Sequence, residues 1–174
     1  VYSHIGWWML KKNQKVKDQG SKLDFSDLKS DWVVWYQHRL YTPIFLLFGV
    51  IGPTAIPYYC WNESLFTSFF LCVVFRITMV LHHIFTVNSL AHFIGHRPYD
   101  YRIRPRENRL VNYISFGEGQ HNFHHAIPYD YRSSDKQVWE LFNPPMLMIE
   151  VSRLLGQAYD RKTASEAVLE GIVK

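Results

Sequence analysis

Two long apolar runs stand out in the pattern of hydrophobic and polar positions. Residues 41–61 contain no charged side chain, and residues 65–87 contain a single one, Arg76. A helix needs about 20 mainly apolar residues to cross the hydrocarbon core of a bilayer, so both runs are long enough. Only residues 62–64 separate them, which leaves room for nothing longer than a turn. The pattern therefore predicts a two-helix transmembrane hairpin.

Breaks in the two runs do not overturn this prediction. Pro43, Pro53 and Pro57 interrupt the first run, but such residues are tolerated in spans that pack against neighbouring helices. Arg76 lies inside the second run, where a cation is costly and normally faces protein, water or a paired group. We expect Arg76 to hold the bundle together through a partner on a span outside this chain.

The flanks of the hairpin carry the remaining elements. Residues 1–40 are predicted to form a cytosolic or interfacial segment, in which residues 4–17 fit an amphipathic helix at the membrane surface. Residues 88–174 alternate short helical patterns with turn signals, which predicts a helical cytosolic cap. Within the cap, residues 136–157 have helical spacing that two adjacent prolines should break or kink early. The predicted fold is an all-α membrane protein.

The distribution of Lys and Arg predicts the orientation. Of the 19 basic residues, seven precede residue 41, eleven follow residue 92, and the loop between the spans has none. Under the positive-inside rule both long flanks are cytosolic, and the loop faces the lumen or the outside. The chain is therefore predicted to be multi-pass, with both of its termini in the cytosol.

Composition argues against several classes of function. The formal net charge is +4, but the basic residues flank apolar segments and form no single patch, so nucleic acid is not an expected partner. Cys60 and Cys72 lie in apolar stretches and suggest neither a disulfide framework nor a zinc site. The sequence has no G-x-S-x-G elbow, P-loop or G-x-G-x-x-G fingerprint. The nine histidines are more informative.

His121, His124 and His125 form an H-x-x-H-H cluster. Offsets of three and four residues fall on one helix face, so these imidazoles can converge on one metal or on two adjacent metals. The alternative is a polar helix face with accidental histidines, and three histidines in five positions favour metal binding over it. Imidazole suits iron, copper, nickel and zinc, so the spacing does not name the metal.

Asn88 and His92 are four residues apart where the second apolar run ends. His92 by itself would more often be an interfacial histidine, and its case as a ligand depends on a second histidine cluster within reach. Asn88 is a candidate weak or water-mediated ligand, with helix–helix hydrogen bonding as the alternative. His82 and His83 point about 100° apart on a helix and are interpreted as polar residues near the bilayer boundary. The histidines given no functional role are His4, His38 and His96.

Eight short strings follow one another along the chain: SHIGW (3–7), QHR (37–39), VNSLAH (87–92), RPYD (97–100), PREN (105–108), GEGQHNFHH (117–125), PYDYR (128–132) and AYDRK (158–162). In this order they resemble the membrane-bound acyl-CoA desaturases of the stearoyl-CoA, or delta-9-type, family. The likeness covers essentially the whole chain, which is similar to the C-terminal half of such enzymes. The GEG-x-HN-[FY]-HH string followed by PYDY is highly specific.

The resemblance implies an endoplasmic-reticulum membrane protein with four membrane helices and a cytosolic cap that holds two iron ions (Fe²⁺). In the family, nine histidines and one asparagine acting through water bind these ions. The chain matches five of these ten positions, at Asn88, His92, His121, His124 and His125. The first two histidine boxes, H-x-x-x-x-H and H-R-x-H-H, are absent and would lie upstream, together with the first two membrane helices.

The resemblance also implies the substrate and partners. The enzyme would introduce a double bond into a fatty acyl-CoA, using O2 and electrons from cytochrome b5 and its reductase, in contact with membrane lipid. Lys11 and Lys12 match a basic pair that contacts the CoA phosphates. Phe85 and Ile84 border the acyl tunnel where relatives usually carry Trp and Thr. The acyl chain length and the double-bond position therefore stay open.

Glu118 precedes His121 by about one helical turn. A carboxylate at this position could orient a ligating imidazole by accepting its second N–H, as such acceptors do around many metal sites. We treat this role of Glu118 as a hypothesis.

Two alternatives to an active desaturase remain. The chain could derive from an inactive truncated isoform or pseudoenzyme that acts as a membrane interaction partner. It could also belong to a related membrane di-iron hydroxylase, although such an enzyme should not carry PYDYR and AYDRK in this order. The upstream coding sequence discriminates, because two intact histidine boxes there favour the enzyme. The chain alone is expected to be inactive.

Overall fold

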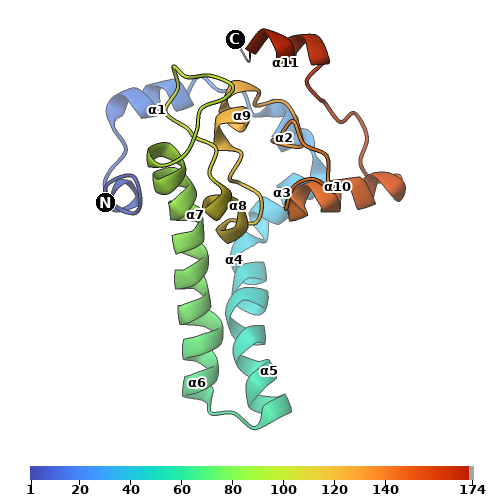
Figure 1. Cartoon of the computed structure of the whole chain (residues 1–174). Coiled ribbons are helices and arrows are strands. Elements are labelled where there is room, and N and C mark those ends of the chain that lie inside the picture. The colour runs from blue at the N-terminus through green and yellow to red at the C-terminus, as the bar shows by residue number, and fades with distance from the viewer. Residues whose placement is uncertain (173–174) are drawn as a thin grey trace. The chain divides into compact units, whose positions relative to one another are not determined.

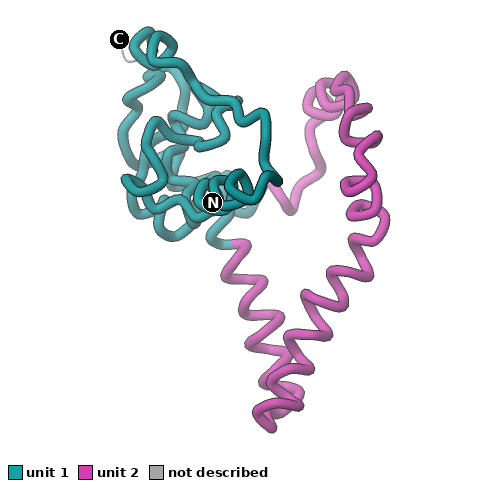
Figure 2. The backbone as a smooth tube through the Cα atoms, turned by 90° about the vertical axis from the view of Figure 1, so that its right-hand side faces the viewer, with its two compact units in different colours: residues 1–6, 82–174 teal, residues 7–81 magenta. Residues whose placement is uncertain are grey.

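The computed structural model describes residues 1–172, in which all regular structure is helical apart from two isolated backbone bridges. The prediction of an all-α fold is confirmed over this range. The chain divides into two compact units, residues 7–81 and residues 1–6 together with 82–172 (Figure 2).

The predicted hairpin is present. One continuous helix runs from Tyr41 to Trp61, and a second begins at Leu65 and extends to Phe93, past the predicted end at residue 87. Figure 1 shows the two helices joined by a short turn, and Figure 2 shows that within residues 7–81 they diverge away from this turn. Each contains a π-helical stretch between α-helical parts: α4 (Tyr41–Ile44), Phe45–Ile51 and α5 (Gly52–Trp61), then α6 (Leu65–Phe69), Phe70–Phe75 and α7 (Arg76–Phe93).

The surface of the hairpin is that of a membrane protein. Both helices are long and apolar enough to span a bilayer, yet only 6% and 11% of their most apolar windows are buried inside the structure. A core helix of a soluble protein would bury most of such a window. The turn between the helices is closed by Asn62 with φ 56°, and the Ser64 hydroxyl caps α6 by accepting from the Thr67 N–H at 3.0 Å.

Arg76 has a partner inside the hairpin. Its guanidinium donates to the backbone carbonyl of Gly49, on the first helix of the hairpin, at 2.6 Å. Gly49 lies in the π-helical stretch Phe45–Ile51. The contact agrees with a structural role for Arg76, and the expected partner on a further span stays a prediction. A charged donor on a backbone acceptor is one of the few ways to satisfy a cation at membrane depth.

The segment before the hairpin also differs from the prediction. Residues 4–17 do not form one amphipathic helix, because a 3₁₀ turn at Gly6–Met9 is followed by non-helical residues. Asn13 then begins a new helix, since its side chain accepts from the Lys15 N–H at 3.0 Å. The helices that follow are α1 (Gln14–Gly20), α2 (Ser26–Ser30) and α3 (Trp32–Arg39).

Residues 82–172 fold around a small apolar core. Ala91, Val111, Phe123 and Ile127 are fully buried, and Met146 is nearly so. The elements of this unit are the end of α7 and four further helices: α8 (Arg109–Ile114), α9 (His121–Ala126), α10 (Pro144–Leu154) and α11 (Glu166–Ile172).

Buried asparagines connect the loops between these helices. Asn122, on α9, is fully buried and accepts from the N–H groups of Tyr99 and Asp100 at 2.9 and 3.1 Å. Its amide group donates to the carbonyls of Asp100 and Pro105 at 2.9 and 3.0 Å. All four hydrogen-bonding positions of this amide are thus used, so a buried polar side chain fixes the RPYD turn against α9.

The helix predicted within residues 136–157 is shorter than expected. It begins at Pro144, so both prolines occupy its first turn and do not break it. Proline is well suited to the start of a helix, where its missing N–H removes no helical bond. Asn143 caps this end by accepting from the Met146 N–H at 3.0 Å.

The PYDYR and AYDRK strings lie against each other. The buried Asp130 carboxylate accepts from the Ala164 N–H at 2.8 Å, and the Tyr131 N–H donates to the Lys162 carbonyl at 3.1 Å. Arg161 also donates to the Tyr131 hydroxyl at 2.7 Å. The C-terminal segment is therefore attached to the loop that follows α9.

Candidate metal centre

The H-x-x-H-H cluster lies on α9, a helix of six residues that is fixed at both ends. Just before it, Gly119 approaches α8 so closely that an added Cβ would lie 2.4 Å from the Asn108 carbonyl oxygen. After it, the N–H of the fully buried Ile127 donates to the Phe123 carbonyl at 2.7 Å. A helix this short would not be stable alone, so tertiary contacts hold its histidines in place.

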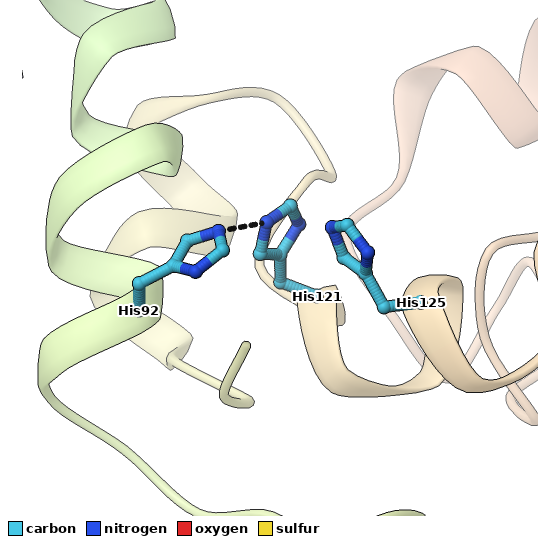
Figure 3. Close-up of side chains that lie close together, drawn as sticks. All are labelled: His92, His121 and His125. Carbon is cyan, nitrogen blue, oxygen red and sulfur yellow. Dashed lines mark hydrogen bonds between the residues drawn. The ribbon is translucent and has the colours of Figure 1, made fainter. Parts of the chain in front are cut away.

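Three histidines converge at one point, His92 from α7 and His121 and His125 from α9 (Figure 3). One ring nitrogen from each lies within 4.8 Å of the others. The Nε2 atoms of His92 and His121 are 2.9 Å apart and share a hydrogen bond. The rings of His121 and His125 meet edge to face, with centroids 4.5 Å apart. Two segments far apart in sequence thus supply one cluster.

His124 and Asn88 lie next to this cluster on the same two helices. The centroid of the His124 ring is 6.1 Å from that of His121 and 5.4 Å from that of His125. Asn88 is half-buried, one turn before His92 on α7. The structure therefore brings three of the five predicted ligands together and leaves the other two outside the three-nitrogen group. Their assignment as ligands stays a prediction.

Burial favours the uncharged imidazoles of His121 and His125. It lowers the pKa of His121 to about 3, and the neighbouring histidines His125, His92 and His124 act in the same direction. Burial also lowers the pKa of His125, again with help from His124 and His92. A metal ion binds the neutral imidazole, so these side chains hold the form that a ligand needs at neutral pH.

The donor set fits a metal ion. The Nδ1 atoms of His121 and His124 are buried, and neither has a hydrogen-bond partner within residues 1–172. Buried polar atoms without a partner are uncommon, and each calls for an explanation such as an ion. Three imidazoles within reach of one point match the chemistry of iron, copper, nickel or zinc. The two buried Nδ1 atoms and the neighbouring three-imidazole group therefore fit a metal ion.

Comparison with known proteins finds acyl-CoA desaturases among the relatives, although no protein-family model matches the chain. The chain is 45% identical over 173 residues to acyl-CoA desaturase 3 of Mus musculus, covering 99% of this chain and 48% of the relative. It is 44% identical to a stearoyl-CoA desaturase of Mesocricetus auratus with the same coverage. Over this length the chain is a homologue of the acyl-CoA desaturases.

The likeness extends beyond mammals. The delta(9)-fatty-acid desaturase fat-6 of Caenorhabditis elegans is 42% identical over 168 residues, which cover 97% of this chain and 49% of the relative. The chain thus spans about half the length of the curated desaturases it matches, their C-terminal half. Its two apolar helices and these relatives together identify a membrane protein.

The predicted substrate residues belong to both units. Lys11 and Lys12 are exposed and belong to residues 7–81. On α7, Phe85 is buried, with 4% of its surface exposed, whereas its neighbour Ile84 is 52% exposed. Glu118 is exposed. The roles proposed for these residues stay predictions.

Sequence reasoning missed Glu107, which lies between the two histidine-bearing helices α7 and α9. Its Oε1 accepts from the Phe123 N–H in the first turn of α9 at 2.8 Å. Burial raises the pKa of the Glu107 carboxyl to about 7, although the N–H groups of Phe123 and Asn122 act against this. The PREN string contains Glu107, but no local spacing relates it to a histidine.

A second histidine contact was also missed. His4, which was given no role, lies with its Nε2 3.0 Å from Nδ1 of His82 and its Nδ1 2.9 Å from the Ser89 hydroxyl. The two rings stack with centroids 5.2 Å apart. The interpretation of His4 as isolated was therefore wrong, because His4 and His82 are 78 residues apart and only the fold brings them together.

Proposed function

We propose that the protein to which this chain belongs is an acyl-CoA desaturase that introduces a double bond into a fatty acyl-CoA. One observation carries the proposal: in a chain homologous to desaturases over 99% of its length, one ring nitrogen each of His92, His121 and His125 lies within 4.8 Å of the others, around the buried His121. Neutral imidazoles and unpartnered Nδ1 atoms at the same point support it further.

The proposed cofactor is a pair of Fe²⁺ ions. Asn88, His92, His121, His124 and His125 would supply five of the ten positions that hold them, and upstream histidine boxes would supply the others. When bound, the irons provide the O2 chemistry that removes two hydrogens from adjacent acyl carbons, a task beyond any amino-acid side chain. The protein's own part is to hold neutral imidazoles in place and to keep water away from the reacting bond.

The proposed substrate is held at two places. Lys11 and Lys12 would pair with the CoA phosphates, and their exposure suits a charged ligand that arrives from water. Ile84 and Phe85 would border the acyl chain. Electrons would come from cytochrome b5 and its reductase at the cytosolic face of the endoplasmic-reticulum membrane, with both termini of this chain in the cytosol. On its own the chain would not desaturate, since it supplies only part of the ligand set.

The test is expression of the gene, including its upstream sequence, in yeast that lacks its own desaturase. Double bonds in the cellular lipids are then located by mass spectrometry. We expect a new unsaturated acyl product, and none from a His121→Gln variant. His38→Gln is the matched control, because His38 is exposed and outside the cluster. Absence of product over several chain lengths would favour a pseudoenzyme, and a hydroxylated product would favour a related di-iron hydroxylase.

A further inference from the structure

One short backbone segment connects the helix of His92 to the helix of His121. The N–H of Arg106 donates to the carbonyl of Ala91, the residue before His92, at 2.6 Å. Glu107 exchanges both backbone hydrogen bonds with His96, at 2.7 and 3.1 Å. The same residue bridges to Gln120, which immediately precedes His121. Residues 106 and 107 therefore lie between the two histidine-bearing helices and bond to both.

The close approach of these segments requires glycine at one point. Gly95 adopts φ +129°, and a Cβ built there would lie 2.0 Å from the carbonyl oxygen of Glu107. A real Cβ cannot come this close, so only glycine permits the exchange of hydrogen bonds between residues 96 and 107. The register of this contact is thereby fixed.

The side chain of Glu107 reaches the same helix as its backbone. α9 has no capping side chain of its own, because Gln120 makes no hydrogen bond to the first turn. Oε1 of Glu107 accepts from the Phe123 N–H at 2.8 Å and supplies the missing cap from another part of the chain. A negative or partly negative oxygen at a helix N-terminus also interacts favourably with the helix dipole.

The Glu107 carboxyl is buried although one of its oxygens has no hydrogen-bond partner among residues 1–172, which suggests a role outside stability. Oε2 of Glu107 is buried without a partner within the described residues, 1–172. Burying such a group lowers the stability of the fold, and an apolar side chain in its place would avoid that loss. The one contact that Oε1 gains is with α9, the helix that carries the H-x-x-H-H cluster.

We propose that Glu107 is a positioning residue of the metal centre. Its backbone holds the end of α7 against the start of α9, and its carboxyl accepts from the first turn of α9, so that His121 and His125 face His92. Glu107 touches no metal and no substrate in this role. The inference rests on the proposed function only in that the histidine cluster binds metal.

The experiment uses the full-length protein, purified without metal and titrated with Co²⁺ as the probe. Imidazole ligands bind Co²⁺, and its visible absorption reports coordination geometry. Glu107→Ala removes the acceptor, whereas Glu107→Gln keeps an oxygen at the same distance. Glu166→Ala and Glu166→Gln are matched controls, because Glu166 is exposed in the first turn of α11.

We expect Glu107→Ala to weaken Co²⁺ binding by about tenfold or more and to change its spectrum, as the loss of an outer partner does at other metal sites. Glu107→Gln should stay within about threefold of the wild type. In the metal-free Glu107→Ala variant, hydrogen exchange should become faster than in the wild type at residues 121–126. Exchange in the transmembrane hairpin should stay unchanged.

Several outcomes would overturn the inference. One is unchanged Co²⁺ binding in Glu107→Ala, and another is hydrogen exchange that rises equally throughout the chain. A Glu107→Gln variant that binds Co²⁺ as weakly as Glu107→Ala, or a wild-type protein that binds no Co²⁺, would also contradict it. Failure of the proposed function looks different. In that case Co²⁺ binding responds as expected, while the gene produces no new double bond in yeast.

Discussion

Two pairs of histidines each have one member on α7, and their nitrogen–nitrogen distances are nearly equal. His92 and His121 approach to 2.9 Å, and His4 and His82 approach to 3.0 Å. In the first pair His121 is buried, and a third imidazole lies within reach. The second pair is at the surface, where Ser89 occupies the remaining nitrogen of His4. Distance alone therefore does not distinguish a metal centre from a hydrogen-bonded pair.

What separates the two pairs is the state of the other ring nitrogens. Around His92, the Nδ1 atoms of His121 and His124 are buried and without partners within the described part of the chain. Around His4, each ring nitrogen already has a hydrogen-bond partner. The first pair therefore has buried nitrogens beside it that an ion could satisfy, whereas His4 in the second pair has no ring nitrogen free. We expect substitutions at the first pair to affect metal binding and those at the second to affect only packing.

The largest effect is expected from His121→Ala, which removes the central ligand of the buried pair. Bound iron per chain should fall, and desaturase product should fall at least about 100-fold, since even the loss of an outer partner of a metal ligand costs 10- to 100-fold in metal affinity or activity. Metal analysis of the purified full-length protein measures the first quantity. An iron content equal to that of the wild type would show that the cluster is not the metal site.

Gly95→Ala should have the next largest effect, because it breaks the contact between residues 96 and 107 that holds His92 and His121 together. A side chain at φ +129°, 2.0 Å from a backbone oxygen, should lower the free energy of unfolding by about 3 kcal/mol. Denaturation in detergent measures this loss. Gly20→Ala is the matched control, since nothing lies within 4 Å of its added Cβ and α1 should gain up to about 1 kcal/mol. Equal stability of the two variants would contradict the role of Gly95.

These two positions also show how far the sequence could lead. Hydropathy predicted the hairpin, because an uncharged run of 21 residues has few alternatives in water or membrane. The H-x-x-H-H spacing predicted that His121 and His125 face the same way, because an offset of four residues returns to one helix face, and their role as ligands stays a prediction. These predictions depend on local periodicity, and periodicity is visible in one sequence.

The contacts that hold the cluster together are not local. The bridge between residues 96 and 107 and the cap from Glu107 to Phe123 join residues 11 and 16 positions apart, through loops with no repeating pattern. The four hydrogen bonds of Asn122 are of the same kind. The local sequence around Glu107 and Asn122 does not distinguish either residue from an ordinary polar residue of a loop or helix. Only the tertiary fold reveals their partners.

A smaller effect is expected from pH, and it concerns the carboxyl of Glu107. The folded-state pKa of Glu107 is raised to about 7 from 4.5, mainly by burial and in part by Asp135. The folded protein therefore binds more protons than the unfolded chain between these values, and its stability falls as pH rises through this range. Glu107→Gln removes this pH-dependent contribution to the free energy of unfolding. Between pH 5 and pH 8, the free energy of unfolding of the variant should therefore rise by about 2 kcal/mol relative to that of the wild type.

Thermal unfolding of the metal-free full-length protein at the two pH values measures this gain. The matched control is Glu166→Gln, whose side chain is exposed and should give the same pH profile as the wild type. A Gln variant that loses stability relative to the wild type as pH rises would show that the Glu107 carboxylate is stabilised, and not opposed, by its surroundings.

The smallest effect is expected at the exposed pair, from His82→Ala. The variant loses one hydrogen bond to His4 and a stacked ring, at a place where water can replace the bond. The free energy of unfolding should therefore fall by less than about 1 kcal/mol. Co²⁺ affinity should stay within about twofold of the wild type, since His82 lies outside the cluster of His92, His121 and His125. A tenfold loss of Co²⁺ affinity would mean that the two pairs are coupled along α7. The exposed pair would then belong to the metal centre despite its surface position.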